Sequence, residues 1–81
     1  MSNFEIWVKG CEINGSNIYP LEGLGENALY KCWKEYSCNH REYYETPVYI
    51  GWVAGKEVCA TTNYLEALHS WQLHMKENDG G

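Results

Sequence analysis

Residues 48–61, VYIGWVAGKEVCAT, are the stretch that decides the fold. Two runs rich in β-branched and aromatic residues, 48–53 and 57–61, lie on either side of Ala54-Gly55-Lys56. A short link containing glycine between two such runs is typical of a β-hairpin. The sequence therefore predicts two antiparallel strands joined by a tight turn.

An amphipathic helix is predicted directly after this hairpin, over residues 63–77. Its apolar positions recur at the spacing of one helix face: Tyr64, Leu68, Trp71 and Met75. Asn63 followed three residues later by Glu66 has the pattern of a capping box, which marks the first turn of a helix. Leu73 falls on the opposite, polar face, where it is either a single exposed leucine or part of a contact surface.

Further elements are expected before the hairpin. They are strands over 4–8 and 12–19, a helix over 26–36 and a strand over 41–45. The chain is expected to turn back after the first strand either at the Asn14-Gly15 turn signal or after Lys9-Gly10. The order of strands, helix, strands and helix predicts one α+β domain over residues 1–77, with both helices packed on one face of a small antiparallel sheet. Residues 78–81 are expected to form a disordered tail.

From residue 26 onward this predicted order of helix, strands and helix resembles the double-stranded RNA-binding domain. The resemblance is topological, and it covers roughly two-thirds of the chain. That family begins its last helix with a Lys-Lys pair directed at phosphates, whereas this chain has Asn63-Tyr64-Leu65-Glu66. RNA binding is therefore not carried over from the family, and a weak nucleic-acid-binding domain of this topology is kept as an alternative.

The chain is short, acidic and rich in aromatic residues. Its 81 residues carry a formal net charge of −5 and include four Trp, seven Tyr and one Phe. A domain of this size cannot bury all of these rings, so some must face solvent or a partner. With only six Lys and Arg in total, direct binding to nucleic acid is not expected, because such binding depends on basic contacts to phosphate. The N-terminus lacks the pattern of a secretion signal and no run has the length of a membrane span, so a cytoplasmic location is expected.

Cysteine and histidine residues supply one metal-binding pattern. Cys32, Cys38 and His40 lie close together in the sequence, and Cys59 or Cys11 would complete a tetrahedral zinc site. Paired zinc thiolates usually lie two to four residues apart, which the spacing of Cys32 and Cys38 exceeds. Free thiols are therefore the favoured interpretation, and no metal or other cofactor is expected. The sequence holds no specific catalytic motif, so the protein is not expected to be an enzyme.

Acidic and aromatic residues alternate irregularly between positions 35 and 45. The candidate partner-binding residues are Glu35, Tyr36, Glu42, Tyr43, Tyr44 and Glu45, together with Leu73. Carboxylates interleaved with aromatic rings suit a basic protein surface. The expected function is a non-enzymatic protein-binding module that inhibits or adapts a larger basic protein, of the type that phages make against host defence such as CRISPR effectors. A zinc-stabilised interaction module is the other alternative.

Overall fold

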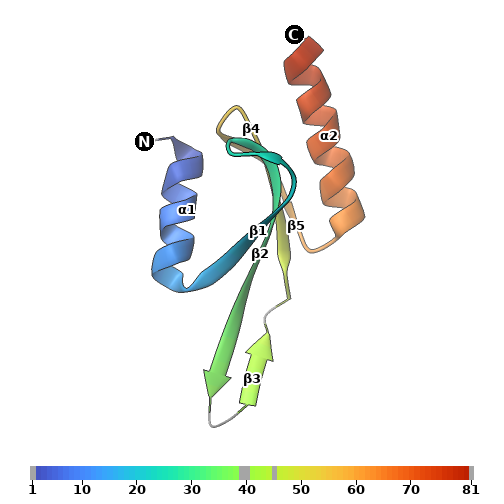
Figure 1. The fold of residues 1–81 in the computed structure, drawn as a ribbon. Coiled ribbons are helices and arrows are strands. Elements are labelled where there is room, and N and C mark those ends of the chain that lie inside the picture. The colour runs from blue at the N-terminus through green and yellow to red at the C-terminus, as the bar shows by residue number, and fades with distance from the viewer. Residues whose placement is uncertain (1, 39–40, 45, 81) are drawn as a thin grey trace.

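The computed structural model describes residues 2–38, 41–44 and 46–80, and for residues 34–38, 41–44, 79 and 80 it describes the backbone alone. Figure 1 shows the order of the elements along the chain. They are α1 (Asn3–Asn14), β1 (Ser16–Leu24), β2 (Asn27–Cys38), β3 (Arg41–Tyr44), β4 (Val48–Val53), β5 (Lys56–Thr61) and α2 (Tyr64–Gly80). Helix α1 begins and α2 ends at the end of the molecule that lies away from β3 (Figure 1). The predicted α+β class, with an antiparallel sheet, is confirmed.

The sheet is built around β2, its longest strand. The strand order is β1-β2-β4-β5, every pairing is antiparallel, and β3 pairs with the last part of β2. The first part of β2 thus lies between β1 and β4, whereas Glu35–Cys38 pairs with β3. Strands β1 and β5 form the two edges.

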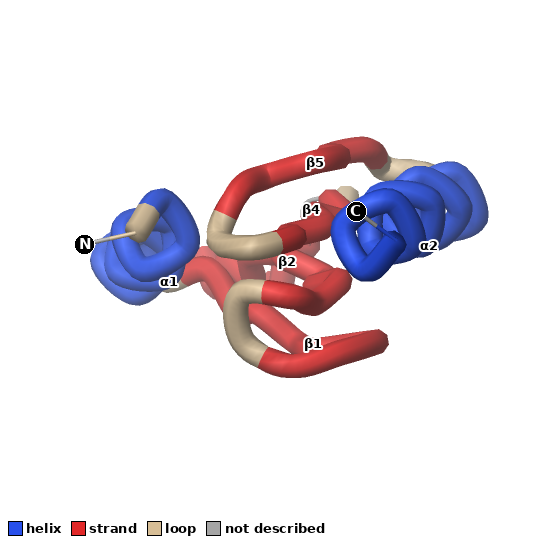
Figure 2. Tube along the Cα trace, turned by 90° about the horizontal axis from the view of Figure 1, so that it is seen from above, coloured by secondary structure: helices blue, strands red, loops and turns tan. Residues whose placement is uncertain are grey.

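The two helices cover opposite faces of the sheet, as Figure 2 shows. On one face, Phe4 and Trp7 of α1 pack against Tyr30 and Trp52. On the other face, α2 packs against the sheet in a second cluster. The buried members of that cluster are Leu29, Val53, Ala67 and Trp71. The prediction that both helices share one face is therefore wrong, because consecutive buried residues in β2 and β4 alternate between two covered faces.

The predicted strand over residues 4–8 is wrong, because these residues lie in α1. The side chain of Ser2 accepts a hydrogen bond from the Glu5 amide, and the Glu5 carboxylate accepts one from the Ser2 amide, which completes a capping box. Gly15 ends the helix in the left-handed conformation with φ 74°. Asn14-Gly15 is thus a helix C-cap and does not turn one strand back on another. The strand predicted over 12–19 begins only at Ser16 and continues to Leu24 as β1.

The predicted helix over residues 26–36 is also wrong, because the chain there forms β2. Ala28, Leu29 and Tyr30 are all buried, with Ala28 and Tyr30 facing α1 and Leu29 facing α2. A strand buried on both faces gives an unbroken apolar run that fits the helical period as well as the strand period. The predicted order of helix, strands and helix from residue 26 onward, on which the resemblance to the double-stranded RNA-binding domain rested, is therefore also wrong.

The C-terminal half follows the sequence prediction. Ala54 and Gly55 both have positive φ, 52° and 77°, as a two-residue hairpin turn requires, and they join β4 to β5. The Glu66 amide donates a hydrogen bond of 3.1 Å to Asn63 Oδ1 at the start of α2. Residues 78–80, predicted to be a tail, continue this helix. Strand β3 confirms the strand predicted over 41–45 as far as Tyr44.

Candidate docking surfaces

The hairpin formed by Glu35–Cys38 of β2 and by β3 extends away from the part of the sheet that the two helices cover. In Figure 1 both helices lie along the other part of the sheet, and α2 runs away from β3. The hairpin backbone is antiparallel, with Glu35 opposite Tyr44, Tyr36 opposite Tyr43 and Ser37 opposite Glu42. We call this segment the β2–β3 hairpin.

The β2–β3 hairpin contains most of the candidate partner-binding residues. Glu35, Tyr36, Glu42, Tyr43 and Tyr44 all lie on its two strands, and Glu45 lies outside the described residues. Because residues opposite one another in an antiparallel pair share a face, Tyr36 and Tyr43 hold positions on one face, and Glu35 and Tyr44 on the other. The structure therefore brings together residues that are as many as nine positions apart in the sequence.

Two other glutamates, Glu22 and Glu26, lie at the end of the sheet opposite the β2–β3 hairpin. Glu22 pairs near the start of β2, and Glu26 directly precedes that strand. Glu35 lies eight positions after Asn27, which corresponds to about 26 Å along an extended strand at about 3.3 Å per residue. Glu22 and Glu26 are therefore separate from the acidic residues of the β2–β3 hairpin.

Tyr30, which lies between Glu26 and Glu35 in the sequence, is part of the core. It is 7% exposed, and its hydroxyl donates a hydrogen bond of 2.8 Å to the Gly25 carbonyl. Burial raises the pKa of the Tyr30 hydroxyl above its ordinary value. The ring of Tyr30 belongs to a cluster whose ring centroids lie 5.4 to 6.0 Å apart. The other members of this cluster are Phe4, Trp7 and Trp52.

Leu73 lies on α2, on a different surface from the β2–β3 hairpin. Its side chain is 48% exposed, as the polar-face position predicts. It lines a shallow hollow of about 200 Å³ together with His69, Gln72 and Lys76. Leu73 and the hairpin therefore do not form one continuous site.

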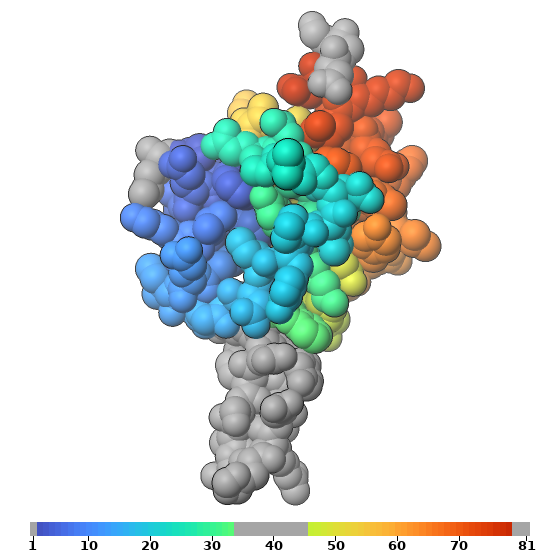
Figure 3. Space-filling view, in the orientation of Figure 1, coloured from blue at the N-terminus to red at the C-terminus, as the bar shows by residue number. Residues whose placement is uncertain are grey.

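A third exposed surface, along β1, was not predicted from the sequence. Tyr19, Leu21 and Leu24 are 47%, 37% and 86% exposed. Figure 3 shows β1, in light blue to cyan, spread over the surface between α1 and α2. Pro20 and a bulge between Pro20 and Glu22 interrupt the regular pairing of this edge strand, which limits further strand addition. Tyr19 and Tyr64, the latter 36% exposed, confirm that not every aromatic ring is buried.

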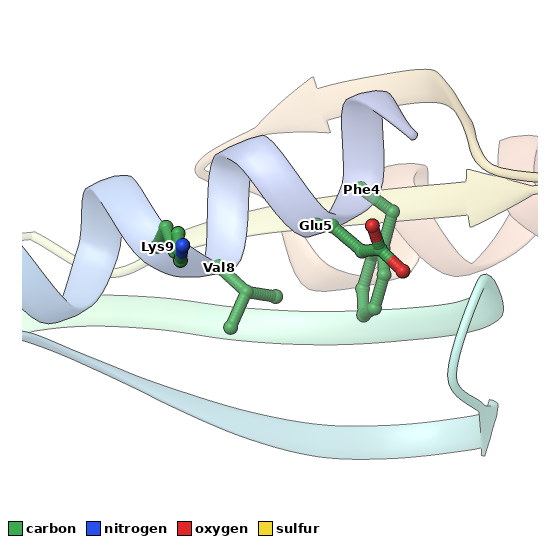
Figure 4. Close-up of a pocket in the computed structure, with 4 residues that line it drawn as sticks. All are labelled: Phe4, Glu5, Val8 and Lys9. Carbon is green, nitrogen blue, oxygen red and sulfur yellow. The ribbon is translucent and has the colours of Figure 1, made fainter. Parts of the chain in front are cut away.

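Helix α1 also borders a pocket of about 250 Å³ that the sequence did not reveal. Its lining residues are Phe4, Glu5, Val8 and Lys9. In Figure 4, Phe4 and Val8 project from α1 toward the strands. These four residues lie in two pairs on successive turns of α1. This spacing is the sequence signal from which a helix over this segment could have been predicted.

The structure separates the cysteines that were considered for zinc. Cys11 and Cys32 meet on the α1 side of the sheet, with 3.9 Å between their sulfur atoms. Cys59 packs on the α2 side, where its thiol lies 3.6 Å from the Ala67 carbonyl oxygen. The Cys38 side chain and His40 lie outside the described part of the chain. Within that part, no three His, Cys, Asp or Glu residues gather as a metal site would require.

Burial raises the pKa values of two cysteine thiols, Cys11 and Cys59. It raises the pKa of Cys11 to about 11, to which the neighbouring Cys32 also contributes. Burial likewise raises the pKa of Cys59. Both cysteines therefore favour the protonated thiol at neutral pH.

Comparison with protein-family models, with curated proteins and with solved structures found no match to this chain. Over the residues that the structure describes, neither helix combines the length and apolarity needed to cross a membrane.

Proposed function

We propose that this protein is a non-enzymatic binding module that docks on a larger basic protein through the β2–β3 hairpin. The observation that carries the proposal is the position of this hairpin, which extends past the two helices and contains five of the seven candidate residues (Figure 1). A projecting two-stranded ribbon offers positions on both of its faces to a partner, and its three tyrosines are of a residue type that is enriched at interfaces.

The charge of the chain favours a basic partner. A formal net charge of −5 on 81 residues attracts a positively charged surface over a long range and repels phosphate. A cytoplasmic protein that handles nucleic acid has such a surface. We therefore group this protein with the small acidic inhibitors that phages direct against such host proteins, of which CRISPR effectors are one example.

The test begins with the wild-type chain as bait and continues with the basic protein that it captures. Binding kinetics are then measured for Tyr43→Ser with Tyr44→Ser and, separately, for Glu35→Gln with Glu42→Gln. We expect the tyrosine pair to increase the dissociation rate at least tenfold, because aromatic anchors act mainly after docking. The glutamate pair is expected to lower the association rate and its dependence on salt, because long-range attraction is screened beyond about 10 Å at 0.1 M ionic strength.

The matched control changes two exposed residues of β1, outside the hairpin, Tyr19→Ser with Leu24→Ser. This variant likewise replaces two large side chains by serine, both of them exposed, and we expect it to bind like the wild type. Circular dichroism establishes that all the variants fold. Wild-type kinetics in both hairpin variants would contradict the proposal, as would tight binding of the wild type to bare DNA or RNA at physiological salt.

A further inference from the structure

Two cysteines that lie far apart in the sequence meet between α1 and the central strand. Cys11 is in the last turn of α1, and Cys32 is in β2. Their sulfur atoms are 3.9 Å apart, a distance at which one thiol can donate to the other. Cys11 is 7% exposed, whereas Cys32 is only partly buried. Neither residue has a role in the proposed docking through the β2–β3 hairpin.

This contact involves the half of α1 that lies outside the aromatic cluster. Among the residues of α1, all of which are described, Cys11 is the one that is buried. Phe4 and Trp7 anchor the first half of the helix in the aromatic cluster. In the last turn, Ile13 is 84% exposed, and Glu12 and Asn14 also face solvent. The Cys11–Cys32 contact therefore joins the last turn of α1 to β2.

We propose that Cys11 and Cys32 are a redox-active pair whose disulfide fastens α1 to β2. To form the bond, the sulfur atoms must approach from 3.9 Å to about 2.05 Å, the length of a disulfide. The link would close a loop of the 20 residues between them, and it would constrain the unfolded chain as well as the helix.

The oxidant that the proposal requires is a low-molecular-weight disulfide such as glutathione disulfide. The thiolate of Cys32, the more accessible of the two, attacks one sulfur of that disulfide, whose S–S bond breaks and releases one glutathione thiolate. The thiolate of Cys11 then attacks the Cys32 sulfur of the mixed disulfide and displaces the second glutathione. The two protein thiols lose two protons and two electrons in total, and glutathione disulfide is reduced to two glutathione molecules.

The raised pKa of Cys11 makes the second step slow at neutral pH, because only the thiolate attacks. We therefore expect a mixed disulfide on Cys32 to form before the internal bond closes. Closure should accelerate as the pH rises toward the pKa of Cys11.

The experiment equilibrates the full chain with glutathione buffers of increasing disulfide content, then quenches with acid and alkylates the remaining thiols. We expect two of the four cysteines to become resistant to alkylation, with a loss of about 2 Da and a cross-link between the peptides that contain Cys11 and Cys32. A variant with Cys38→Ser and Cys59→Ser should form the same link. Adding Cys11→Ser to it should stop the reaction at the mixed disulfide.

A second measurement tests the fastening of α1. In the oxidised protein we expect slower hydrogen exchange at the amides of the second half of α1 and a melting temperature at least about 5 °C higher than in the reduced protein. Four alkylatable thiols at the highest disulfide ratio would overturn the proposal, and so would a link to Cys38 or Cys59. Unchanged exchange in α1 after the correct link has formed would overturn the fastening role.

Discussion

Trp71 and Gly51 show how closely α2 approaches the sheet. The indole N–H of Trp71 donates a hydrogen bond of 3.1 Å to the carbonyl of Trp52, and the Trp71 side chain is 8% exposed. Gly51, the neighbour of Trp52 in β4, presents no side chain toward the indole. Helix α2 therefore reaches the backbone of β4 at this point, which a larger residue would prevent.

We expect Gly51→Ala to lower the free energy of unfolding by about 1–3 kcal/mol, because a methyl group has no room there. A Cβ at position 51 would lie 2.6 Å from Cys59 Sγ and 3.1 Å from Trp71 Cδ1. The change is measured by denaturant titration followed by Trp fluorescence.

Gly10→Ala is the matched control for that substitution. Gly10 lies in the interior of α1, and a Cβ there would meet no heavy atom within 4 Å. Since alanine is the better helix former, we expect this variant to be about 0.5–1 kcal/mol more stable than the wild type. An equal effect of the two substitutions would show that close packing against Trp71 does not decide the cost at Gly51.

Helix α1 depends on a cap that is separate from its packing. The Ser2 hydroxyl accepts a hydrogen bond of 3.2 Å from the Glu5 amide. We expect Ser2→Ala to lower the free energy of unfolding by about 1 kcal/mol, because it leaves that amide without its partner. Urea titration gives the size of the change, and hydrogen exchange shows whether the loss is concentrated in the first turn of α1.

Asn63→Ala provides the comparison at α2, where the Asn63 side chain accepts from the Glu66 amide over 3.1 Å. A loss of similar size is expected, with faster exchange confined to the first turn of α2. Faster exchange throughout both helices would indicate that the caps act through global stability rather than locally.

The sequence was sufficient for those elements whose signals are local. The turn at Ala54-Gly55 and the cap at Asn63 each lie within a few residues of the elements that they define, and both were predicted correctly. The signals for α1 were also local, since Ser2 and Glu5 form a capping box, but the β-rich composition of 4–8 favoured a strand. Propensity is a weak signal beside capping and burial.

The misassignment of β2 has a different cause. Its helical period arises from burial on both faces, and that burial depends on α1 and α2, which come from opposite ends of the chain. No short window of sequence contains this information. The same limit applies to the proposed docking surface, because the sequence could suggest Tyr36 and Tyr43, but only strand pairing places them opposite each other.

The molecule as a whole should lose stability in alkaline solution. Burial raises the pKa of Cys11 to about 11 from an ordinary value of 9.0, and it also raises the pKa values of Cys59 and Tyr30. The folded protein thus holds these protons more tightly than the unfolded chain does. Their contribution to stability is complete below pH 9 and is lost progressively as the pH rises from 9 toward 11.

Urea titrations of the reduced protein at pH 8, 9, 10 and 11 measure this loss. We expect the midpoint to fall across the upper part of this range, and to fall less steeply in Cys11→Ala, which lacks the group with the largest shift. A midpoint that is constant or rises between pH 9 and pH 11 would be inconsistent with burial of these groups.

The placement of the chain ends gives the molecule two distinct poles. Helix α1 begins and α2 ends away from β3, so the β2–β3 hairpin is at the far pole from both (Figure 1). A fusion partner, affinity tag or solid support joined through either end would therefore leave the hairpin pointing into solution. Two copies joined end to end by a flexible linker would present two hairpins outward, and for a partner that docks on the hairpin as proposed, such a tandem protein would gain avidity without redesign of the fold.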